Sequence, residues 1–145
     1  MAEPPSGIVQ RTVNELIDRL QAISQLNTKI FQVYSEEDLL NAARQSKKPC
    51  LGVMYEGLAP VGDPARGGLS TMLSMALVLI SDSNAIGGAQ RQSDTLDLLD
   101  QMRNVMKEQK ATSGHKWAFG GEVSGGSLGN NNLYVQRWRC PAILT

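Results

Sequence analysis

The chain has 145 residues, of which 41% are hydrophobic and 19% are charged, and this size and composition are typical of one globular domain. Its 14 basic and 14 acidic side chains give a formal net charge of zero, which excludes a general electrostatic attraction to nucleic acid or to an anionic membrane. The most apolar run, residues 69–80, is shorter than the roughly 20 residues that span a bilayer, and no signal peptide is visible. We therefore expect a soluble protein that is made and assembled inside a cell.

Residues 1–7 contain two prolines and one glycine, so we expect a flexible arm before a folded domain of residues 8–145. An amphipathic helix should follow, because apolar residues recur at helical spacing from residue 8 to Ile23. Ser6 is the expected cap of this helix. Such a helix must bury its apolar stripe, most simply against a sheet.

The next elements are short and alternate between strand and helix. Residues 29–34 predict a strand. Ser35, followed three residues later by Asp38, resembles a capping box that starts a helix over residues 36–45. Residues 50–55 predict the second strand.

The apolar run that begins at residue 69 is the centre of the predicted fold. Its first half alternates polar and apolar residues, and its second half is apolar at every position up to residue 80. This pattern favours a central strand over residues 69–82, covered on both faces at its far end. A buried helix is the alternative, because leucine, methionine and alanine also favour helices.

Two glycine-rich stretches, residues 56–68 and 120–132, are expected to be long loops. The first contains four glycines and two prolines, and the second combines repeated glycines with three consecutive asparagines. Long loops in a compact domain commonly bind a partner, and the first stretch could also form a long hairpin arm.

The last helix is predicted over residues 95–110, with Ser93 or Asp94 as its cap. Its acidic residues come early and its lysines late, an order that complements the helix dipole. A short strand is expected at residues 116–119.

The final strand is predicted over residues 133–140, and Pro141 should limit further pairing. Alternation places Arg137 and Arg139 on one side and Trp138 on the other. We interpret Trp138 as a core residue that lies opposite a row of arginines. That row could contact another protein, face solvent or, with a weaker signal, meet nucleic acid.

Together these elements predict a single α+β domain. Its sheet should be antiparallel or mixed, with about four to five strands and with two main helices packed mostly on one face.

The sequence contains no recognisable catalytic or metal-binding pattern. His115 is the only histidine, and it follows a helix end without a nearby nucleophile. Cys50 and Cys140 are far apart, and we expect both to be buried and reduced. The glycine pairs lack the spacing of phosphate-binding loops. We therefore expect no enzymatic activity, no metal and no cofactor.

The order of elements, together with the small size, resembles the tail terminator proteins of tailed bacteriophages, of the lambda type and of Mu-like contractile phages. The matching parts are the opening helix at residues 8–23, the strand around Tyr55 that leads into a glycine-rich stretch, and the apolar strand at residues 69–81. The late helix at residues 95–110 and a two-stranded finish that ends in residues 134–138 also match.

This resemblance implies a structural virion protein of the tail and neck, assembled in the host cytoplasm. Terminators form a ring, generally a hexamer, that caps the tail tube and stops its polymerisation. The ring then joins the tail to neck or head-completion proteins. The implied partners are further copies of the chain, the tail tube protein, the neck protein and, in a contractile tail, the sheath protein. DNA would only pass through the channel, and no membrane is involved.

The residues that we expect at protein contacts lie in the two glycine-rich stretches and on the final strand. They are Gly57, Leu58, Pro60, Arg66, Gly125, Asn130, Arg137 and Arg139.

Three other readings remain open. The chain could be a tail-completion or head–tail connector protein with a related fold. It could be a small-ligand or nucleotide-binding module, with the glycine pairs as its site. It could also be a component of a bacterial secretion or injection machine that shares a tail-derived fold.

Overall fold

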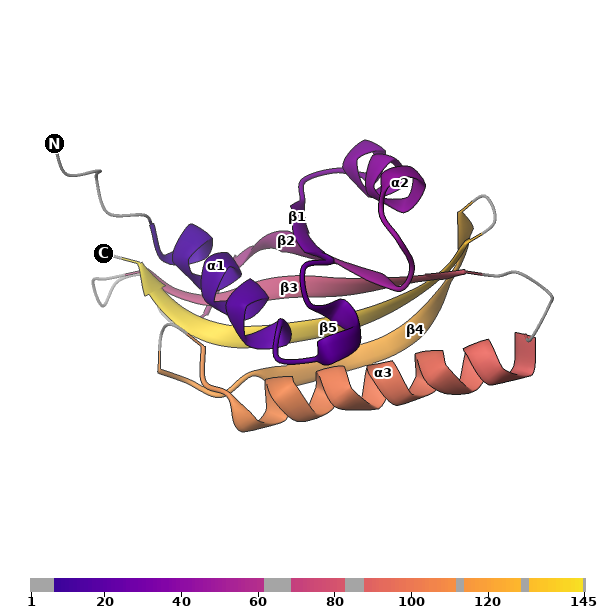
Figure 1. Ribbon diagram of the computed structural model, residues 1–145. Helices are drawn as coiled ribbons and strands as arrows, with labels where there is room; N and C mark the ends of the chain where they lie inside the picture. The colour runs from indigo at the N-terminus through magenta and orange to yellow at the C-terminus, as the bar shows by residue number, and fades with distance from the viewer. Residues whose placement is uncertain (1–6, 62–68, 83–87, 112–113, 129–130, 145) are drawn as a thin grey trace, which may run out of the picture.

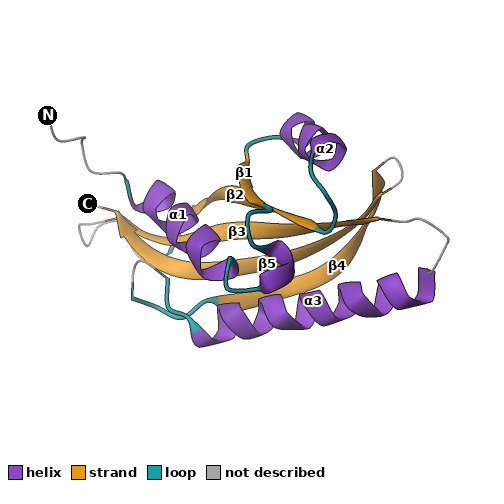
Figure 2. Ribbon diagram, viewed as in Figure 1, coloured by secondary structure: helices purple, strands orange, loops and turns teal. Residues whose placement is uncertain are grey.

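A mixed sheet of five strands carries helices on both of its faces (Figure 1 and Figure 2). The computed structural model describes residues 7–61, 69–82, 88–111, 114–128 and 131–144. The elements in chain order are α1 (Ile8–Leu20), a short 3₁₀ turn (Ser24–Leu26), β1 (Ile30–Val33), α2 (Glu36–Gln45), β2 (Cys50–Pro60), β3 (Leu69–Asp82), α3 (Gly88–Glu108), β4 (Ala118–Leu128) and β5 (Asn131–Leu144).

β3 lies at the centre of the sheet, whose strand order is β1-β2-β3-β5-β4. β1 runs parallel to β2, and the other neighbours are antiparallel. β3 pairs with β5 over its whole length, from Leu69 opposite Leu144 to Asp82 opposite Asn131. The predicted α+β domain and its central strand are thereby confirmed, and the buried-helix alternative for this run is wrong.

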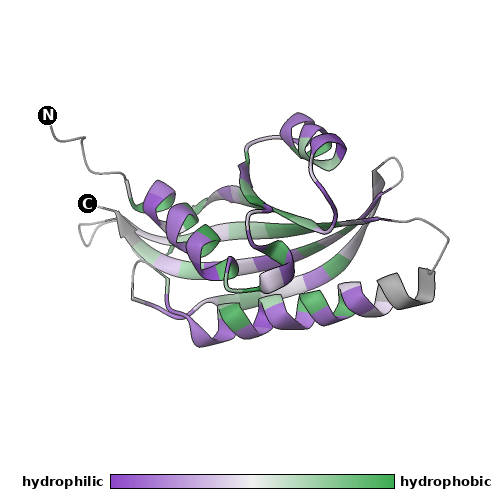
Figure 3. Cartoon of the chain, viewed as in Figure 1, coloured by the Kyte–Doolittle hydropathy of each residue, from purple (hydrophilic) through white to green (hydrophobic). Residues whose placement is uncertain are grey.

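The main core lies between one face of the sheet and helices α1 and α3. Leu73, Met75, Leu77 and Leu79 alternate along β3 and are all fully buried on this side. α1 and α3 supply the opposing apolar side chains, and hydrophilic and hydrophobic residues alternate along both helices in Figure 3. The residues of each strand that point toward α1 and α3 therefore form the main core. The core residues from the two helices are Val13, Leu16, Leu20, Leu98, Leu99, Met102 and Met106.

A second, smaller core lies on the opposite face beneath α2. Leu39 and Ala43 of α2 pack with Ala76, Val78 and Ile80, which come from the second half of β3. As predicted, the far end of the central strand is thus covered on both faces, whereas α2 leaves the other half of this face open (Figure 1).

The short helix α2 begins with the predicted capping interaction. The Ser35 hydroxyl accepts a hydrogen bond from the Asp38 backbone N–H at 3.2 Å, and the Asp38 carboxylate accepts one from the Tyr34 N–H at 3.0 Å. These two bonds satisfy N–H groups at a helix start that would otherwise need water. The side chain thus fixes where the chain turns from β1 into α2.

The other two helices begin or end elsewhere than predicted. α1 is capped at Gly7 rather than at Ser6, which lies outside the described residues, and it ends at Leu20 before the 3₁₀ turn. α3 begins at Gly88, so Ser93 and Asp94 lie inside the helix and do not cap it. Alanine and glutamine at residues 89–92 extend the helix beyond the apolar stripe on which the prediction was based.

For the first part of residues 56–68 the predicted loop is wrong and the alternative of a long hairpin arm is correct, because β2 continues to Pro60 and pairs antiparallel with the start of β3. The glycine that suggested a loop is absorbed in a β-bulge between Tyr55 and Gly57, where Gly57 has a φ of 139°. Residues 62–68 lie outside the described part of the chain.

The loop predicted over residues 120–132 is likewise wrong for residues 120–128 and 131–132, which belong to strands, while residues 129–130 lie outside the described part of the chain. β4 runs through Leu128, and bulges fall between Phe119 and Glu122 and between Ser124 and Gly126. Gly121 and Gly126 have positive φ angles of 114° and 86° at these bulges, so glycine here marks irregular pairing within a strand.

Pro141 does not limit the pairing of the final strand, as had been expected. β5 continues to Leu144, and Pro141 pairs with Met72 of β3. The pairing of β5 with β4 ends at Arg139, so Pro141 occupies a part of β5 that has one neighbouring strand in the described residues. A proline is tolerated there because the side without a neighbour needs no N–H donor.

Candidate functional site

Six of the eight predicted contact residues lie in the described part of the chain. Arg66 and Asn130 lie outside it. The six are Gly57, Leu58, Pro60, Gly125, Arg137 and Arg139.

The structure brings three of these residues together on the side of the sheet that carries α2. Gly57 and Arg139 both pair with Ser74 of β3, one from each side, so Gly57, Ser74 and Arg139 form one row across the sheet. Arg137 lies two residues before Arg139 on the same side. Leu58 instead packs against the main core, so only part of the prediction converges on one surface.

Pro60 and Gly125 do not join this group. Pro60 ends β2, opposite Thr71. Gly125 is on β4, where a Cβ would lie 3.3 Å from the Cβ of Leu133, close to the smaller core. These two residues thus occupy other parts of the sheet.

The part of the sheet that α2 leaves uncovered is named the open half-face. Ser74 and Met72 are partly exposed there, whereas Val78 and Ile80 on the same side of β3 are buried under α2. Its glycine, alanine and serine residues have no side chain or a short one, so the backbone lies close to the surface there. The two longer arginine side chains project beyond it. The open half-face is formed by Gly57, Ala59, Met72, Ser74, Arg137 and Arg139.

Arg137 forms an ion pair across β3 with Glu56 of β2. Its Nε lies 3.2 Å from the Glu56 Oε1 and 3.4 Å from the Oε2, and half of the Arg137 side chain is exposed. Arg139 is exposed and pairs along the backbone with Ala118 and Ser74. Two guanidinium groups against one carboxylate leave the open half-face with a net positive charge.

Beneath the arginines, on the main-core side, a buried amide holds β5 in place. Gln136 is fully buried, and its amide nitrogen donates to the Leu99 carbonyl at 3.0 Å and to the Glu122 carboxylate at 2.7 Å. Its amide oxygen accepts from the Trp138 indole at 3.1 Å. Because these bonds fix the side on which Gln136 and Trp138 lie, they also fix Arg137 and Arg139 on the other side.

The same network reaches the surface through Arg103 of α3, which bonds to both Glu122 and Asp100. Partial burial lowers the pKa of Arg103, but the bonds to the two carboxylates outweigh this effect and leave the pKa above its usual value. Sequence reasoning missed the network. The available signal was a glutamine on the same strand face as Trp138 and Cys140, where a polar side chain requires a partner.

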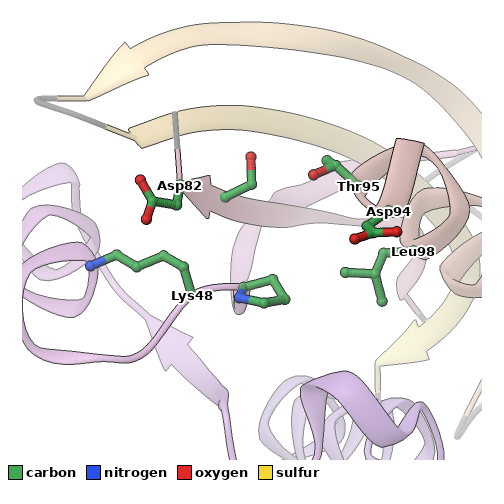
Figure 4. Close-up of a pocket in the computed structure, with 7 residues that line it drawn as sticks. Lys48, Asp82, Asp94, Thr95 and Leu98 are labelled. Carbon is green, nitrogen blue, oxygen red and sulfur yellow. The ribbon is translucent and has the colours of Figure 1, made fainter. Parts of the chain in front are cut away.

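A cavity of about 240 Å³ lies at the far end of β3 (Figure 4). Lys48 and Asp82 lie on one side of it, and Asp94, Thr95 and the apolar Leu98 lie on the other. This volume is below the roughly 300–1,000 Å³ of most ligand pockets, so the space suits a small polar molecule. The lining residues are Lys48, Pro49, Ser81, Asp82, Asp94, Thr95 and Leu98.

The described residues contain no group of three or more side chains that could hold a metal ion. His115, the one histidine of the sequence, is exposed. Cys50 and Cys140 are buried and not disulfide-bonded, as predicted, and burial raises the pKa of Cys50 while Lys48 and Lys29 partly oppose the rise. No described helix combines the length and apolar character that a membrane crossing requires.

Comparison of the chain with models of protein families finds no match, and comparison with curated proteins finds none either. The open half-face and the cavity therefore have to be interpreted from their own geometry and chemistry.

Proposed function

We propose that this chain is a structural virion protein resembling a phage tail terminator. It would form a ring, capping the tail tube, stopping tail polymerisation and joining the tail to the head or neck. The observation that supports this proposal is the open half-face, a part of the sheet that the chain's own helices leave uncovered. A fold whose own helices leave half of one sheet face uncovered is suited to assembly.

The chemistry of the open half-face also favours a protein contact. Arginine is enriched in interfaces because its planar guanidinium forms several directed hydrogen bonds while its stem packs against apolar groups. Short side chains such as Gly57 and Ser74 let a partner approach the backbone closely. Arg139 supplies a charged group that projects toward such a partner.

The partners under this proposal are further copies of the chain, six to a ring, and the tail tube protein. The neck or head-completion protein would bind the ring on the head side, and the sheath protein would surround it in a contractile tail. DNA passes through the channel without being the ligand. The protein would then be found in the tail and neck of the virion.

Electron microscopy and native mass spectrometry of the purified chain test this proposal. We expect six-fold rings, and we expect added chain to stop the growth of tail tubes assembled from tube protein. A stable monomer that stays monomeric when mixed with tube protein would contradict it. A connector or tail-completion protein of related fold would instead bind the head-side partner without stopping tube growth.

The cavity at the far end of β3 favours a second candidate, a module that binds a small polar ligand. Lys48 could pair with an anionic group while Asp82 or Asp94 accepts hydrogen bonds from the ligand. Thermal unfolding with and without nucleotides tests this candidate. A rise in melting temperature that Lys48→Ala abolishes would support it, and an unchanged melting temperature would count against a nucleotide site.

A further inference from the structure

The exposed aromatic side chains of the described residues gather at the two lateral edges of the sheet. Tyr34 is 75% exposed and Tyr55 is 38% exposed, and both lie beside β1 and β2. Phe119 is 49% exposed and Val123 is 53% exposed, and both lie on β4 at the opposite edge. Val61 and Leu96 are exposed elsewhere, at 48% each, but the exposed aromatic side chains of the described residues lie only at these two edges, which points to two contact surfaces.

Both edges also have unpaired strand backbone. β1 pairs with β2 only as far as Val33 opposite Met54, so β2 has no neighbour on that side from Tyr55 to Pro60 within the described residues. β4 is the outermost strand on the opposite side of the sheet, and within the described residues its one neighbouring strand is β5. We name these surfaces the first edge (Tyr34 and Tyr55) and the second edge (Phe119 and Val123).

One row of residues joins the two edges directly across the sheet. Tyr55 pairs with Met75, Met75 pairs with Trp138, and Trp138 pairs with Phe119. Met75 and Trp138 are buried at 0% and 4% exposure, whereas the side chains at the two ends of the row are exposed. The Phe119 ring lies 5.0 Å from that of Trp138, so the second edge is supported by the core.

The charges beside the two edges are complementary. Glu36 and Glu37, both exposed, follow Tyr34 at the first edge. Lys116 precedes Phe119 at the second edge, and Arg139 is paired with Ala118 next to it; both basic side chains are exposed. An acidic edge and a basic edge on one chain of zero net charge attract each other between copies.

We infer that the first edge of one copy packs against the second edge of the next copy. Tyr34 and Tyr55 would meet Phe119 and Val123 of the neighbour, with Glu36 and Glu37 facing its basic side chains. The inference rests on the proposed ring and specifies which surfaces form it. Because the two edges differ, the contact is head-to-tail, and repeated head-to-tail contacts close into a ring or continue as a helix.

Side-chain packing, and not a continuous backbone ladder, would dominate this contact. The two bulges in β4 and the bulge at Gly57 in β2 interrupt regular pairing at both edges. Bulges at an edge limit uncontrolled strand addition, which keeps such a surface selective for one neighbour.

Cysteine cross-linking of the full chain tests the inference. Tyr55→Cys and Phe119→Cys are made singly and together, and each is treated with a short bismaleimide. Native Cys50 and Cys140 are buried, so their background reaction should be low. We expect the two single variants to cross-link only when mixed, giving dimers. The double variant should give a ladder that ends at the ring size.

A second pair, Tyr34→Cys with Val123→Cys, repeats the test at positions that are more exposed, so folding is disturbed less. In the control, Asn41→Cys, at an exposed position on α2, is mixed with Val123→Cys in place of Tyr34→Cys. We expect the cross-linked fraction of this control pair to be at least about tenfold lower than that of the Tyr34→Cys pair.

Each alternative outcome overturns the inference in a distinguishable way. Rings seen by electron microscopy without cross-links in either pair would reject these edges and leave the proposed ring standing. Efficient cross-linking of one single variant with itself would indicate a two-fold contact. A chain that stays monomeric at all concentrations would reject both the inference and the proposed ring.

Discussion

The two sides of β5 differ sharply although they are built from consecutive residues. On one side Gln136 and Trp138 are buried under α3, and on the other Arg137 and Arg139 project into solvent. The strand itself does not create this difference, because α1 and α3 cover the first side and α2 covers only half of the second (Figure 1). One strand can therefore supply stability on one side and a surface for assembly on the other.

This comparison separates two kinds of measurement. Substitutions on the main-core side should lower the free energy of unfolding of the single chain. Substitutions on the open half-face should leave that free energy almost unchanged and alter association instead. This distinction is wrong if main-core variants alter association without lowering the free energy of unfolding, or if variants of the open half-face lower that free energy.

Trp138→Ala is expected to have the largest effect. It removes a large buried side chain, the ring contact with Phe119 and the indole donor to Gln136. Loss of a buried tryptophan costs about 3–5 kcal/mol of unfolding free energy, because the cavity left behind closes only in part. Urea unfolding monitored by circular dichroism measures the change, and a loss below about 1 kcal/mol would show that this side is not tightly packed.

Gln136→Leu is expected to rank second. It leaves the buried Trp138 indole N–H without its hydrogen-bond partner, while the Leu99 carbonyl and Glu122 each lose one donor but keep another. An unsatisfied buried group costs about 1–3 kcal/mol, and we expect a loss in that range. Gln109→Leu, at an exposed position, is the matched control and should change the unfolding free energy by less than about 0.5 kcal/mol.

Gly52→Ala tests the smaller core under α2. A Cβ at this position would lie 2.7 Å from the Val33 Cγ2, so the two side chains cannot both keep their places. We expect a loss of about 1–2 kcal/mol, since the obstacle is a side-chain methyl group that can shift. Val33→Ala removes that methyl group, so the double variant should lose less than the sum of the single variants. Additive losses would show that Val33 is not the obstacle.

The alternation of residues was enough to predict the central strand and the side of the sheet on which its residues and those of β5 lie. The apolar run that forms β3 predicted its bounds and the burial of its second half on both faces, because period-two alternation directly reflects which side a residue faces. The same reasoning placed Trp138 in the core and the two arginines on the opposite side.

Glycine was the main source of error. Glycine permits positive φ angles both in loops and in bulges, so Gly57, Gly121 and Gly126 did not distinguish the two. The sheet edges could not be found from sequence either. The row that joins Tyr55 to Phe119 depends on the strand order and on the registers of three strand pairs, none of which local patterns specify.

Arg139→Glu should have the smallest effect on the folded chain. The side chain is exposed, and no ion pair with another described residue holds it, so the unfolding free energy should change by less than about 0.5 kcal/mol. Arg137→Glu is a less clean change, because it would place a second carboxylate next to Glu56. Arg139→Glu thus changes the charge of the open half-face with little effect on the fold.

The effect of Arg139→Glu should instead appear in ring formation, because reversing a charge at a contact replaces attraction by repulsion. Analytical ultracentrifugation at low and at high salt measures it, and we expect the defect to shrink as salt screens the charge. Lys107→Glu is the matched control, because Lys107 is exposed on α3, on the opposite side of the sheet. If both variants assemble normally at ordinary salt, Arg139 is only solvated surface. In that case neither the open half-face nor a charge contact of Arg139 at the second edge would hold the copies together, and the apolar side chains of the two edges would have to do so.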